Sequence, residues 1–384
     1  MIYLDNGATS FPKPKGMMAA MEECIMKYCG NPGRSGHQMA LMTGEAVYRA
    51  RQAVAEVFGV EDGSRLIFTK NTTEALNMGI RGILQDGDHV ITTSMEHNSV
   101  LRPLKWMEKR GISQSIVRAD RDGSIHASDM EKCITGKTRM IIVTAASNVT
   151  GTRMPLEEIG RICRRHGVLF MVDGAQGAGS MDLDVEKHHI DLLAFPGHKG
   201  LLGPQGTGGI YVSPDLELEP LMQGGTGTES RSRLQPSELP DGFEAGTINA
   251  PAIIGLGYSA AYVNRIGAET IGSYEEALIC RLEEKLREIP GIRLYGPEPE
   301  KKTGITLFNL NGYEAEEITE RLSRHYGIAV RGGYHCAGLA HKTIGTWETG
   351  AVRVSVGPYN TPSDMDCLAD ALRELAAAAE KGRK

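Results

Sequence analysis

Short apolar runs alternate with helical periods between about residues 65 and 212. The runs that are typical of strands cover residues 65–69, 89–93, 113–119, 139–144, 168–173, 191–195 and 208–213. Amphipathic stretches lie between them, for example residues 72–84 and 156–167. Strands and helices that alternate in this way form a mostly parallel sheet. The pattern therefore predicts an α/β domain whose ligands bind where the strands end.

The rest of the chain has a different order. Residues 213–250 are rich in Gly, Ser, Pro and Glu and show no period, which predicts a long loop. A helical pattern over 251–289 is followed by strand patterns at 291–296, 304–310, 327–333 and 351–356, with helical ones over 314–326 and from 362 onward. This order predicts a smaller α+β domain. We expect an N-terminal segment that packs with the small domain (1–15), a large α/β domain (16–255) and the small domain itself (256–384).

Composition and charge exclude several classes of protein. The 384 residues are 41% hydrophobic and 23% charged, and the net charge of −6 is not concentrated in any acidic or basic block. We therefore expect no nucleic acid and no membrane as a partner. No apolar run approaches the roughly 18 residues of a membrane helix, and the start lacks a signal-peptide pattern, so we expect a cytoplasmic protein. The seven cysteines are scattered without a CxxC pair, so neither a disulfide framework nor a metal site is expected.

Polar residues follow several of the predicted strands. They are Thr69 to Thr73, Glu96 to Asn98, Asn148, Asp173 to Gln176, and His198 with Lys199. Asp173 and Lys199 end two strands that are separated by about one βαβ step, so their strand ends are expected to be neighbours. These residues together predict the rim of a pocket.

Lys199 and Asp173 suggest a specific chemistry. The glycine-rich turn "GHKGLLGPQGTGG" leaves Lys199 open for covalent attachment of an aldehyde. An aspartate can keep a pyridine nitrogen protonated, so that the ring acts as an electron sink. Both features are requirements of pyridoxal 5'-phosphate (PLP), although an ordinary salt bridge between the two residues is the simpler alternative.

A phosphate needs hydrogen-bond donors, and the segment "FTKNTTEALN" offers them. Asn71, Thr72 and Thr73 stand at a turn from a strand into a helix, where free amide groups meet the positive end of the helix dipole. The alternative is that Thr72 or Thr73 only caps the helix.

The motifs, taken together, resemble those of a known family. From "YLDNGATS" near residue 3 to "VRVSVGPYNT" near 361, the motifs "NTTEALN", "MEHNS", "SNVTGT", "VDGAQ", "GHKG", "FEAGTIN" and "RGGYHCAG" are similar, in the same order, to those of cysteine desulfurases of the class V aminotransferase family. The last motif is close to the "RxGxHCA" pattern of the short-loop group. The resemblance implies fold type I of the PLP-dependent transferases, with a mostly parallel seven-stranded sheet flanked by helices and a smaller α+β domain.

The resemblance also implies roles for the cofactor-binding residues. Lys199 would hold PLP covalently, Asp173 would pair with the pyridinium nitrogen, and Gln176 would contact the phenolic oxygen of the ring. His97 would stack on the ring and move protons. Further residues would bind the cofactor, namely Thr72, Thr73 and His198 at the phosphate and Asn148 beside the ring. Taken alone, a histidine such as His97 is more often a structural or surface residue.

Substrate residues and a second subunit follow from the same resemblance. Arg353 would clamp the substrate carboxylate with its planar guanidinium, although a surface charge is the alternative. The substrate would also meet Asn31, Arg34, His37, Asn148 and Arg331. Thr247 would reach the phosphate of a neighbouring subunit, which implies a homodimer. One position departs from the family: Pro196 replaces a common hydroxyl residue of the lysine motif, and proline cannot donate a hydrogen bond to phosphate.

Cys336 would be the sulfur acceptor of the reaction. Gly332, Gly333 and Gly338 would give its loop the freedom to move, and positive charge on His335 or Arg331 would favour the thiolate. A buried and inert cysteine is the alternative. Short-loop relatives depend on a dedicated sulfur acceptor protein, but the residues after Ala337 differ from the usual pattern, which puts the identity of that partner in doubt.

The expected activity is therefore conversion of L-cysteine to L-alanine, with the sulfur passing to Cys336 as a persulfide for iron-sulfur cluster or thiocofactor synthesis. A selenocysteine lyase with the same fold is the first alternative, because a selenolate leaves more readily. A noncatalytic scaffold is the second, although it would have no evident need for Lys199, Asp173, His97 and Arg353 together.

Overall fold

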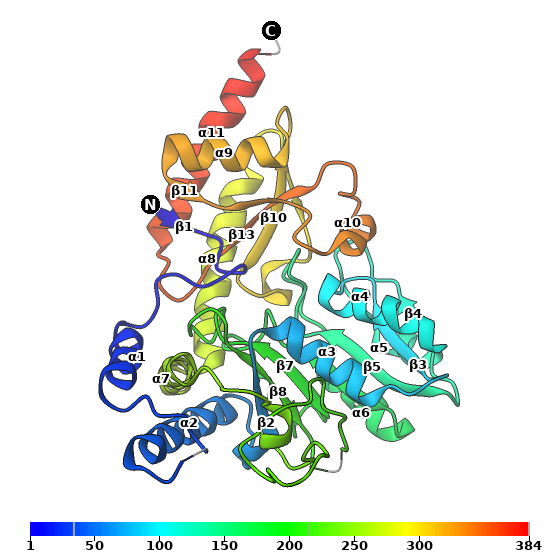
Figure 1. Ribbon diagram of the computed structural model, residues 1–384. Coiled ribbons are helices and arrows are strands. Elements are labelled where there is room, and N and C mark those ends of the chain that lie inside the picture. Colours follow the sequence, from blue (N-terminus) through cyan, green and yellow to red (C-terminus); the bar gives the residue numbers. More distant parts are fainter. Residues whose placement is uncertain (34, 215, 383–384) are drawn as a thin grey trace.

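A computed structural model describes residues 1–33, 35–214 and 216–382 of the chain. Two sheets organise these residues, a seven-stranded one and a four-stranded one, and a short two-stranded pair stands beside the smaller sheet. In Figure 1 the larger sheet with its helices occupies the lower half of the molecule and the smaller sheet the upper half. The chain termini both lie in the upper half.

The larger sheet is mixed but mostly parallel, as predicted. Its strands are β2 (Leu66–Thr69), β3 (His89–Thr93), β4 (Ser113–Val117), β5 (Thr138–Thr144), β6 (Leu169–Asp173), β7 (Leu192–Pro196) and β8 (Gly208–Val212), in the spatial order β2-β8-β7-β6-β5-β3-β4. Only β8, which lies between β2 and β7, runs opposite to the other six strands. The parallel strands therefore present their carboxyl ends at one edge of the sheet, which is where ligands bind in such folds.

Helices cover both faces of this sheet. α3 (Thr72–Ile83) and α4 (Asn98–Met107) pack on one face. The other face is covered by α2 (Gln38–Val57), α5 (Ala127–Lys132), α6 (Leu156–His166) and α7 (Ala250–Ile266), with α1 (Lys15–Lys27) packed on α7. Since both faces are buried, the central strands β6 and β7 are apolar at nearly every position rather than at alternate ones.

The smaller sheet is antiparallel. Its strands are β9 (Ile292–Tyr295), β10 (Ile305–Leu310), β12 (Arg331–Gly333) and β13 (Ala351–Ser355), in the order β12-β13-β10-β9. α8 (Ala268–Arg287), α9 (Ala315–Tyr326) and α11 (Pro362–Gly382) share one core with it, and α10 (Gly338–Ile344) follows β12. β1 (Ile2–Tyr3) pairs in parallel with β11 (Ile328–Ala329), far along the chain. The domain boundaries at residues 15 and 255 stay a prediction.

One helical prediction was too long. The pattern over 251–289 forms two helices, α7 and α8, which are separated at Gly267. This glycine has a φ of 91°, a conformation that a side chain disfavours, so the chain turns there. Residues 216–249 form no helix or strand apart from a short 3₁₀ turn at Asp241–Phe243, in agreement with the predicted loop.

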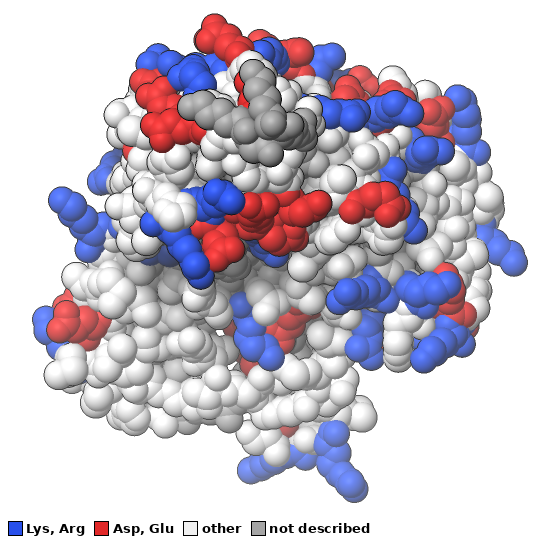
Figure 2. Space-filling model, turned by 90° about the horizontal axis from the view of Figure 1, so that it is seen from above, with Lys and Arg blue, Asp and Glu red and all other residues white. Residues whose placement is uncertain are grey.

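Charged side chains of both signs are spread over the surface. Figure 2 shows lysine and arginine beside aspartate and glutamate over the face seen from above. Among the described helices, none combines the length and the apolar character that crossing a membrane requires.

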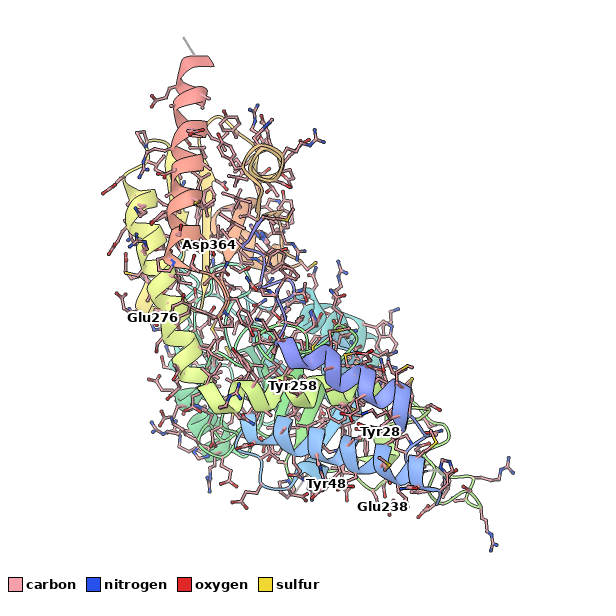
Figure 3. The ribbon with its side chains drawn as sticks, turned by 90° about the vertical axis from the view of Figure 1, so that its left-hand side faces the viewer. Tyr28, Tyr48, Glu238, Tyr258, Glu276 and Asp364 are labelled. Carbon is pink, nitrogen blue, oxygen red and sulfur yellow. The ribbon has the colours of Figure 1, made fainter. Side chains whose placement is uncertain are left out.

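The helices α1, α2 and α7 form one side of the larger half of the molecule, and this side carries several tyrosines. Figure 3 shows α1, α2 and α7 next to one another, with Tyr28, Tyr48 and Tyr258 on this side. α2 and α7 are in extensive contact, as are α1 and α7.

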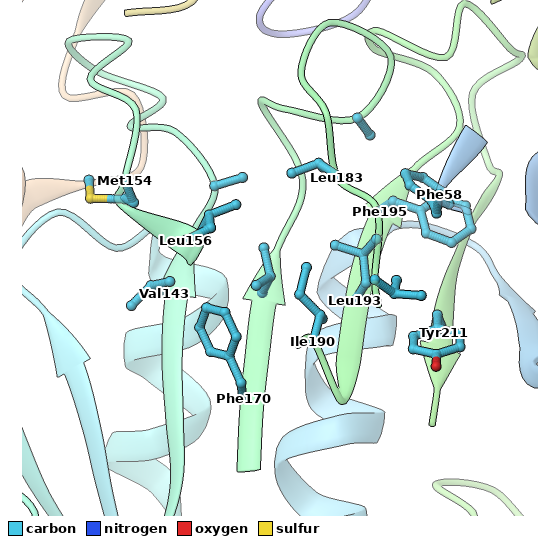
Figure 4. Packing of buried hydrophobic residues seen from close by; sticks show 14 of the residues in the cluster. Phe58, Val143, Met154, Leu156, Phe170, Leu183, Ile190, Leu193, Phe195 and Tyr211 are labelled. Atoms are coloured by element: carbon cyan, nitrogen blue, oxygen red, sulfur yellow. The ribbon is translucent and has the colours of Figure 1, made fainter. Parts of the chain in front are cut away.

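The core beneath the larger sheet is aliphatic and aromatic. Figure 4 shows Val143, Phe170, Leu193 and Phe195 in one layer, contributed by the neighbouring strands β5, β6 and β7. Burying each large side chain of this kind contributes roughly 1.5–3 kcal/mol. This packing fixes the strands whose carboxyl ends carry the candidate site.

Candidate active site

The neighbouring strands β6 and β7 bring Asp173 and Lys199 together. Asp173 ends β6, where it pairs with Ala194 of β7, and Lys199 follows the end of β7. Asp173 is buried and its Oδ1 accepts a hydrogen bond from the amide of Ala175 at 3.0 Å. Burial raises the pKa of this carboxyl, while the charge of Lys199 opposes the rise. The sequence prediction that these two strand ends are neighbours is confirmed.

Lys199 is held in a state suited to a nucleophile. It is half-buried and makes no hydrogen bond or ion pair with any described residue. Burial, and next the positive charge of Arg353, lower the pKa of Lys199 to about 8, against the opposing charges of Asp173 and Asp5. About a tenth of the amine is therefore neutral at pH 7, far more than for an ordinary lysine, and the neutral form is the one that attacks an aldehyde.

His97 stands at the start of α4 as its N-cap residue. Its Nδ1 accepts the backbone amide of Ser99 at 3.0 Å and lies 2.9 Å from the Ser99 hydroxyl. Burial lowers the pKa of His97 to about 4, and the next cause is the charge of Lys199. The ring is therefore neutral at physiological pH, and because Nδ1 accepts, its proton is on Nε2.

The amino end of α3 offers hydroxyl groups that are not used as caps. Asn71 is the N-cap residue, and its side chain accepts the amide of Glu74 at 3.0 Å. The alternative that Thr72 or Thr73 caps this helix is therefore wrong. The hydroxyl of Thr73 lies 2.8 Å from that of Ser99. Thr73 and Ser99 place two hydroxyl groups beside His97.

Sequence reasoning did not assign Ser99 a role. Its signal was present, because Ser99 ends the quoted motif "MEHNS", but only contact with Thr73 across two helices connects it to the site. Ser99 supplies a hydroxyl near Thr73 in a chain whose Pro196 lacks one.

His198 lies in the loop after β7, next to Lys199. Its carbonyl accepts hydrogen bonds from the side chains of Thr9, Ser10 and Lys13, all from the N-terminal segment. Its ring Nδ1 is buried and has no partner in the part of the chain that the structure describes. Burial, assisted by the charge of Lys199, lowers the pKa of this histidine to about 4. A buried ring nitrogen without a partner is suited to receive a ligand.

Arg353 is buried in β13 of the smaller sheet, and its guanidinium contacts Asn148, which follows β5 of the larger sheet. Its Nη2 forms an ion pair with Asp5 at 2.8 Å, and its Nη1 donates to the carbonyl of Asn148 at 2.9 Å. Its Nε is buried without a partner among the described residues. The alternative that Arg353 is a surface charge is wrong, since only 1% of it is exposed. Arg331 pairs with Arg353 across β12 and β13, so two guanidinium groups come from adjacent strands.

Asn148 connects this arginine with the loop of Cys336. Its side-chain amide donates to the carbonyl of His335 at 2.6 Å. Gln176 donates to the carbonyl of Gly7 at 3.1 Å and lines the same small cavity as Lys199. Asp5 was missed from the sequence as a site residue, although it belongs to the quoted motif "YLDNGATS".

Cys336 lies exposed beside this group of residues. His335 and Cys336 both have positive φ, 52° and 57°, which are unusual for residues other than glycine. The carbonyl of Cys336 accepts the amide of Asn98 at 2.9 Å, which attaches the loop to the start of α4. Cys336 lines a groove of about 490 Å³, and its walls also contain Thr73, His97, Arg102 and Trp106. The alternative of a buried Cys336 is therefore wrong.

Two expectations about the Cys336 loop need correction. His335 is buried, with its ring nitrogens 3.1 Å from the carbonyl of Arg331 and 3.3 Å from Nε2 of His341. Burial lowers the pKa of His335 to about 2, so it is neutral and cannot supply positive charge to the thiol. Gly332 has a packing role instead of a hinge role, because a Cβ there would lie 2.8 Å from the carbonyl oxygen of Ala315.

Other predicted residues lie apart from Lys199 within the chain. The Asn31 amide is 3.5 Å from the Thr247 hydroxyl, and His37 caps α2 by accepting the amide of Ala40 at 3.3 Å. Asn31, His37 and Thr247 line neither the cavity at Lys199 nor the groove at Cys336. Arg34 lies outside the described residues. Participation of these residues in a site with Lys199 stays a prediction, as does the reach of Thr247 into a neighbouring subunit.

Comparison with known proteins identifies the family. The aminotransferase class-V family model matches residues 2–368. The chain belongs to the class-V aminotransferase family. Within this family it is similar to a probable cysteine desulfurase from Methanothermobacter thermautotrophicus, with 38% identity over 382 residues, covering 98% of this chain and 94% of the relative. A probable cysteine desulfurase from Pyrococcus abyssi is 35% identical over 384 residues, with coverage of 98% and 94%.

Solved structures of class-V relatives have the same fold. The apo cysteine desulfurase from Thermococcus onnurineus NA1 superposes with a TM-score of 0.93 and 35% identity, covering 98% of this chain and 95% of that one. The cysteine desulfurase CsdA from Escherichia coli, in an S-sulfonic acid form, gives 0.87 and 30%, with coverage of 98% and 94%. The fold expected from the sequence motifs is confirmed.

Proposed function

We propose that this chain is a PLP-dependent cysteine desulfurase that converts L-cysteine to L-alanine and receives the sulfur on Cys336. The observation that carries the proposal is that the neutral ring of His97 and the exposed thiol of Cys336 line one groove, while Lys199 lies close enough to lower the pKa of His97. The names of the relatives from Methanothermobacter and Thermococcus support the same activity.

The residues at the rim of the large sheet fit PLP. Asp173 has one carboxylate oxygen engaged by Ala175, which leaves the other for a pyridinium nitrogen. The unpaired ring nitrogen of His198 and the hydroxyls of Thr73 and Ser99 at the start of α3 suit a phosphate group. When bound, PLP supplies an electron sink for the substrate α-carbon. Lys199, Asp173, Thr73 and His198 would hold it, with Thr72, Asn148 and Gln176 as further contacts.

The chain's own residues then perform the transfer. Arg353, which is buried and paired with Asp5, would bind the substrate carboxylate with its guanidinium, and Arg331 on the adjacent strand would add positive charge. Lys199, as a neutral amine, removes and returns protons at the substrate. The Cys336 thiolate forms a sulfur–sulfur bond while the carbon–sulfur bond of the substrate breaks. Cys336 is left as a persulfide and the substrate carbon skeleton becomes alanine.

The sulfur then has to leave Cys336 for an acceptor protein. The groove at Cys336 continues between α3 and α4, where Arg81 lies over the ring of Trp106, with its Cζ 4.9 Å from the ring centroid. Neither Arg81 nor Arg102 forms an ion pair within the described residues, and both are exposed. We infer that this open side admits the acceptor. Iron-sulfur or thiocofactor synthesis as the destination and a cytoplasmic location remain expectations from the sequence.

We also propose a homodimer. Large apolar side chains are exposed on α1 and α2, namely Met18, Ile25, Met26, Met39, Leu41, Met42 and Tyr48. Exposed apolar groups of this density are typical of an interface. A second copy would also bring Thr247 and Asn31 to a site from which they are separated within one chain.

Substitution of the thiol tests the proposed activity. We expect Cys336→Ala to lose nearly all formation of alanine from L-cysteine while its circular dichroism spectrum is unchanged. Cys367→Ala, which removes another exposed cysteine in α11, is the matched control and should keep full activity. Mass spectrometry after cysteine treatment should find one added sulfur on the Cys336 peptide only. Substantial alanine formation by Cys336→Ala would refute the acceptor role.

The same pair of variants separates the selenium alternative. A selenolate leaves more readily than a thiolate, so a selenocysteine lyase depends less on an attacking thiol. Faster turnover of selenocysteine than of cysteine, retained in Cys336→Ala, would favour that activity over the proposed one.

A further inference from the structure

A small cavity connects Lys199 with a buried carboxyl that the proposed reaction does not use. The cavity measures about 40 Å³ and its lining includes Ser10, Gln176, Lys199, Glu275 and Ser355. A water molecule needs about 10–15 Å³ measured in this way, so the space admits two or three waters. The residues that line it include ones with hydroxyl, amide, amine and carboxyl groups, which can bind water.

Glu275 is the unexplained member of this lining. It lies on α8, only 7% of it is exposed, and it makes no hydrogen bond or ion pair with any described residue. Its Oε2 is 3.0 Å from the position that a Cβ on Gly304 would take, so the carboxyl closely approaches the backbone at a residue that also lines the cavity. A buried carboxyl without a partner is costly, and cavity water is the partner that this position allows.

We propose that Glu275 and the cavity water form a proton relay with Lys199, in which Glu275 takes up the proton that Lys199 releases and later returns it. The ammonium of Lys199 becomes a neutral amine as the carboxylate of Glu275 becomes a carboxylic acid. The proton passes through the intervening water, no other bond is formed or broken, and the total charge of the pair is zero before and after. The proposal rests on the proposed function only in giving Lys199 its role as the reactive amine.

Electrostatics support the exchange. Burial is the largest cause that lowers the pKa of Lys199 to about 8 and raises the pKa of Glu275 to about 8, so it favours the neutral form of each group. Two neutral groups are also favoured over two charges in a buried site. The charges that act on Lys199 are those of Arg353, Asp173, Arg331 and Asp5, and the charge that acts on Glu275 is that of Arg153. His97 and His198 beside Lys199 are neutral.

The test measures the proton affinity of Lys199 in protein free of PLP. The rate at which an amine-reactive acylating reagent modifies Lys199 is followed by mass spectrometry across pH, which gives the pKa of Lys199. We expect Glu275→Gln to lower this pKa by roughly 0.5–1 unit, because the carboxylate that stabilises the ammonium is lost. Glu275→Asp, which keeps the carboxyl, should restore most of the wild-type value.

Glu276→Gln is the matched control. Glu276 is the adjacent residue of α8, labelled in Figure 3, but its carboxylate pairs with Arg153 at 3.0 Å and does not line the cavity. It should leave the pKa of Lys199 unchanged. The reciprocal experiment follows the infrared band of the Glu275 carboxylic acid across pH. In Lys199→Met this band should persist to higher pH than in the wild type, because binding of protons at two coupled sites is mutual.

Unchanged titration of Lys199 in folded Glu275→Gln, together with an unchanged Glu275 band in Lys199→Met, would overturn the relay. Borohydride reduction after addition of PLP tests the proposed function separately. A pyridoxyl group fixed on Lys199 would retain that function even if the relay fails, and its absence would reject the function without affecting the titration.

Discussion

Ionisable residues around the site are uncharged because they are buried. His97, His198, His335 and His341 all have a pKa far below the usual 6.5 of histidine, and burial is the largest cause for each. Glu96, next to His97, is fully buried, and burial raises its pKa to about 8. Asp5 and Arg353 keep their charges as an ion pair, whereas burial raises the pKa of Asp173.

His341 should make the protein sensitive to acid. Its pKa is about 4 in the folded protein and near 6.5 when unfolded, so below pH 6.5 the unfolded chain binds a proton that the folded one does not. Stability is therefore lost as the pH falls from 6.5 to 4, by about 2 kcal/mol at pH 5. We expect the free energy of unfolding, measured with urea, to decrease less between pH 7.5 and pH 5 for His341→Gln than for the wild type.

The control for this prediction is an exposed histidine. His126→Gln removes a side chain that is 67% exposed and should leave the decrease between pH 7.5 and 5 as it is in the wild type. Equal acid sensitivity of wild type and His341→Gln would contradict the assignment.

At the level of elements, the segment before β10 (residues 301–303) forms hydrogen bonds with the loop that carries Asn148. The amide of Thr303 donates to the carbonyl of Gly151, and that of Arg153 donates to the carbonyl of Lys301. A buried ion pair fixes this segment, because the Lys302 ammonium contacts the carboxylate of Glu283 on α8. The small-sheet region therefore contributes to the position of Asn148, although Asn148 itself follows β5 of the larger sheet.

Breaking this ion pair should destabilise the protein strongly. Lys302→Met leaves Glu283 buried with less compensation, which costs about 3 kcal/mol. We expect the free energy of unfolding, measured with urea, to fall by about this amount. Lys301→Met changes the exposed neighbour and should alter it by less than about 0.5 kcal/mol. A similar small loss for both variants would contradict the importance of the pair.

At the level of the whole molecule, exposed apolar side chains gather on one side. α1, α2 and α7 enclose a hollow of about 460 Å³ whose lining includes Met42, Ala46 and Tyr258. Figure 3 shows Tyr258 and Tyr48 on this side of the molecule. Asn31, in the loop between α1 and α2, and Thr247, in the loop before α7, belong to the same region.

A charge on this side should separate the proposed dimer. Met42 is 43% exposed, so Met42→Glu can be tolerated in a monomer but would bury an unpaired charge in an interface. We expect light scattering to find a dimer for the wild type and a monomer for Met42→Glu at the same concentration. Ile116→Glu, at an equally exposed residue of β4, should stay dimeric. A monomeric wild type would reject the proposal.

The order of strands and helices was largely readable from the sequence, because apolar periodicity and turn residues act over a few neighbouring positions. The break at Gly267 was missed, since one glycine within a helical pattern does not reveal its φ. Lys199, Asp173 and Cys336 were identifiable because each belongs to a local motif. Arg353 was located in the same way, but its burial was not.

The sequence by itself determined the strands, the family motifs and which residues carry reactive groups. Only the tertiary structure decided how these groups are held: the pairing of Asp5 with Arg353, the contact of Thr73 with Ser99, the neutral state of His335 and the position of Glu275 on a cavity with Lys199. The physical reason is the separation along the chain of the residues that interact. Local periodicity follows from backbone geometry, whereas burial and proton affinity depend on residues that are brought together from distant parts of the chain.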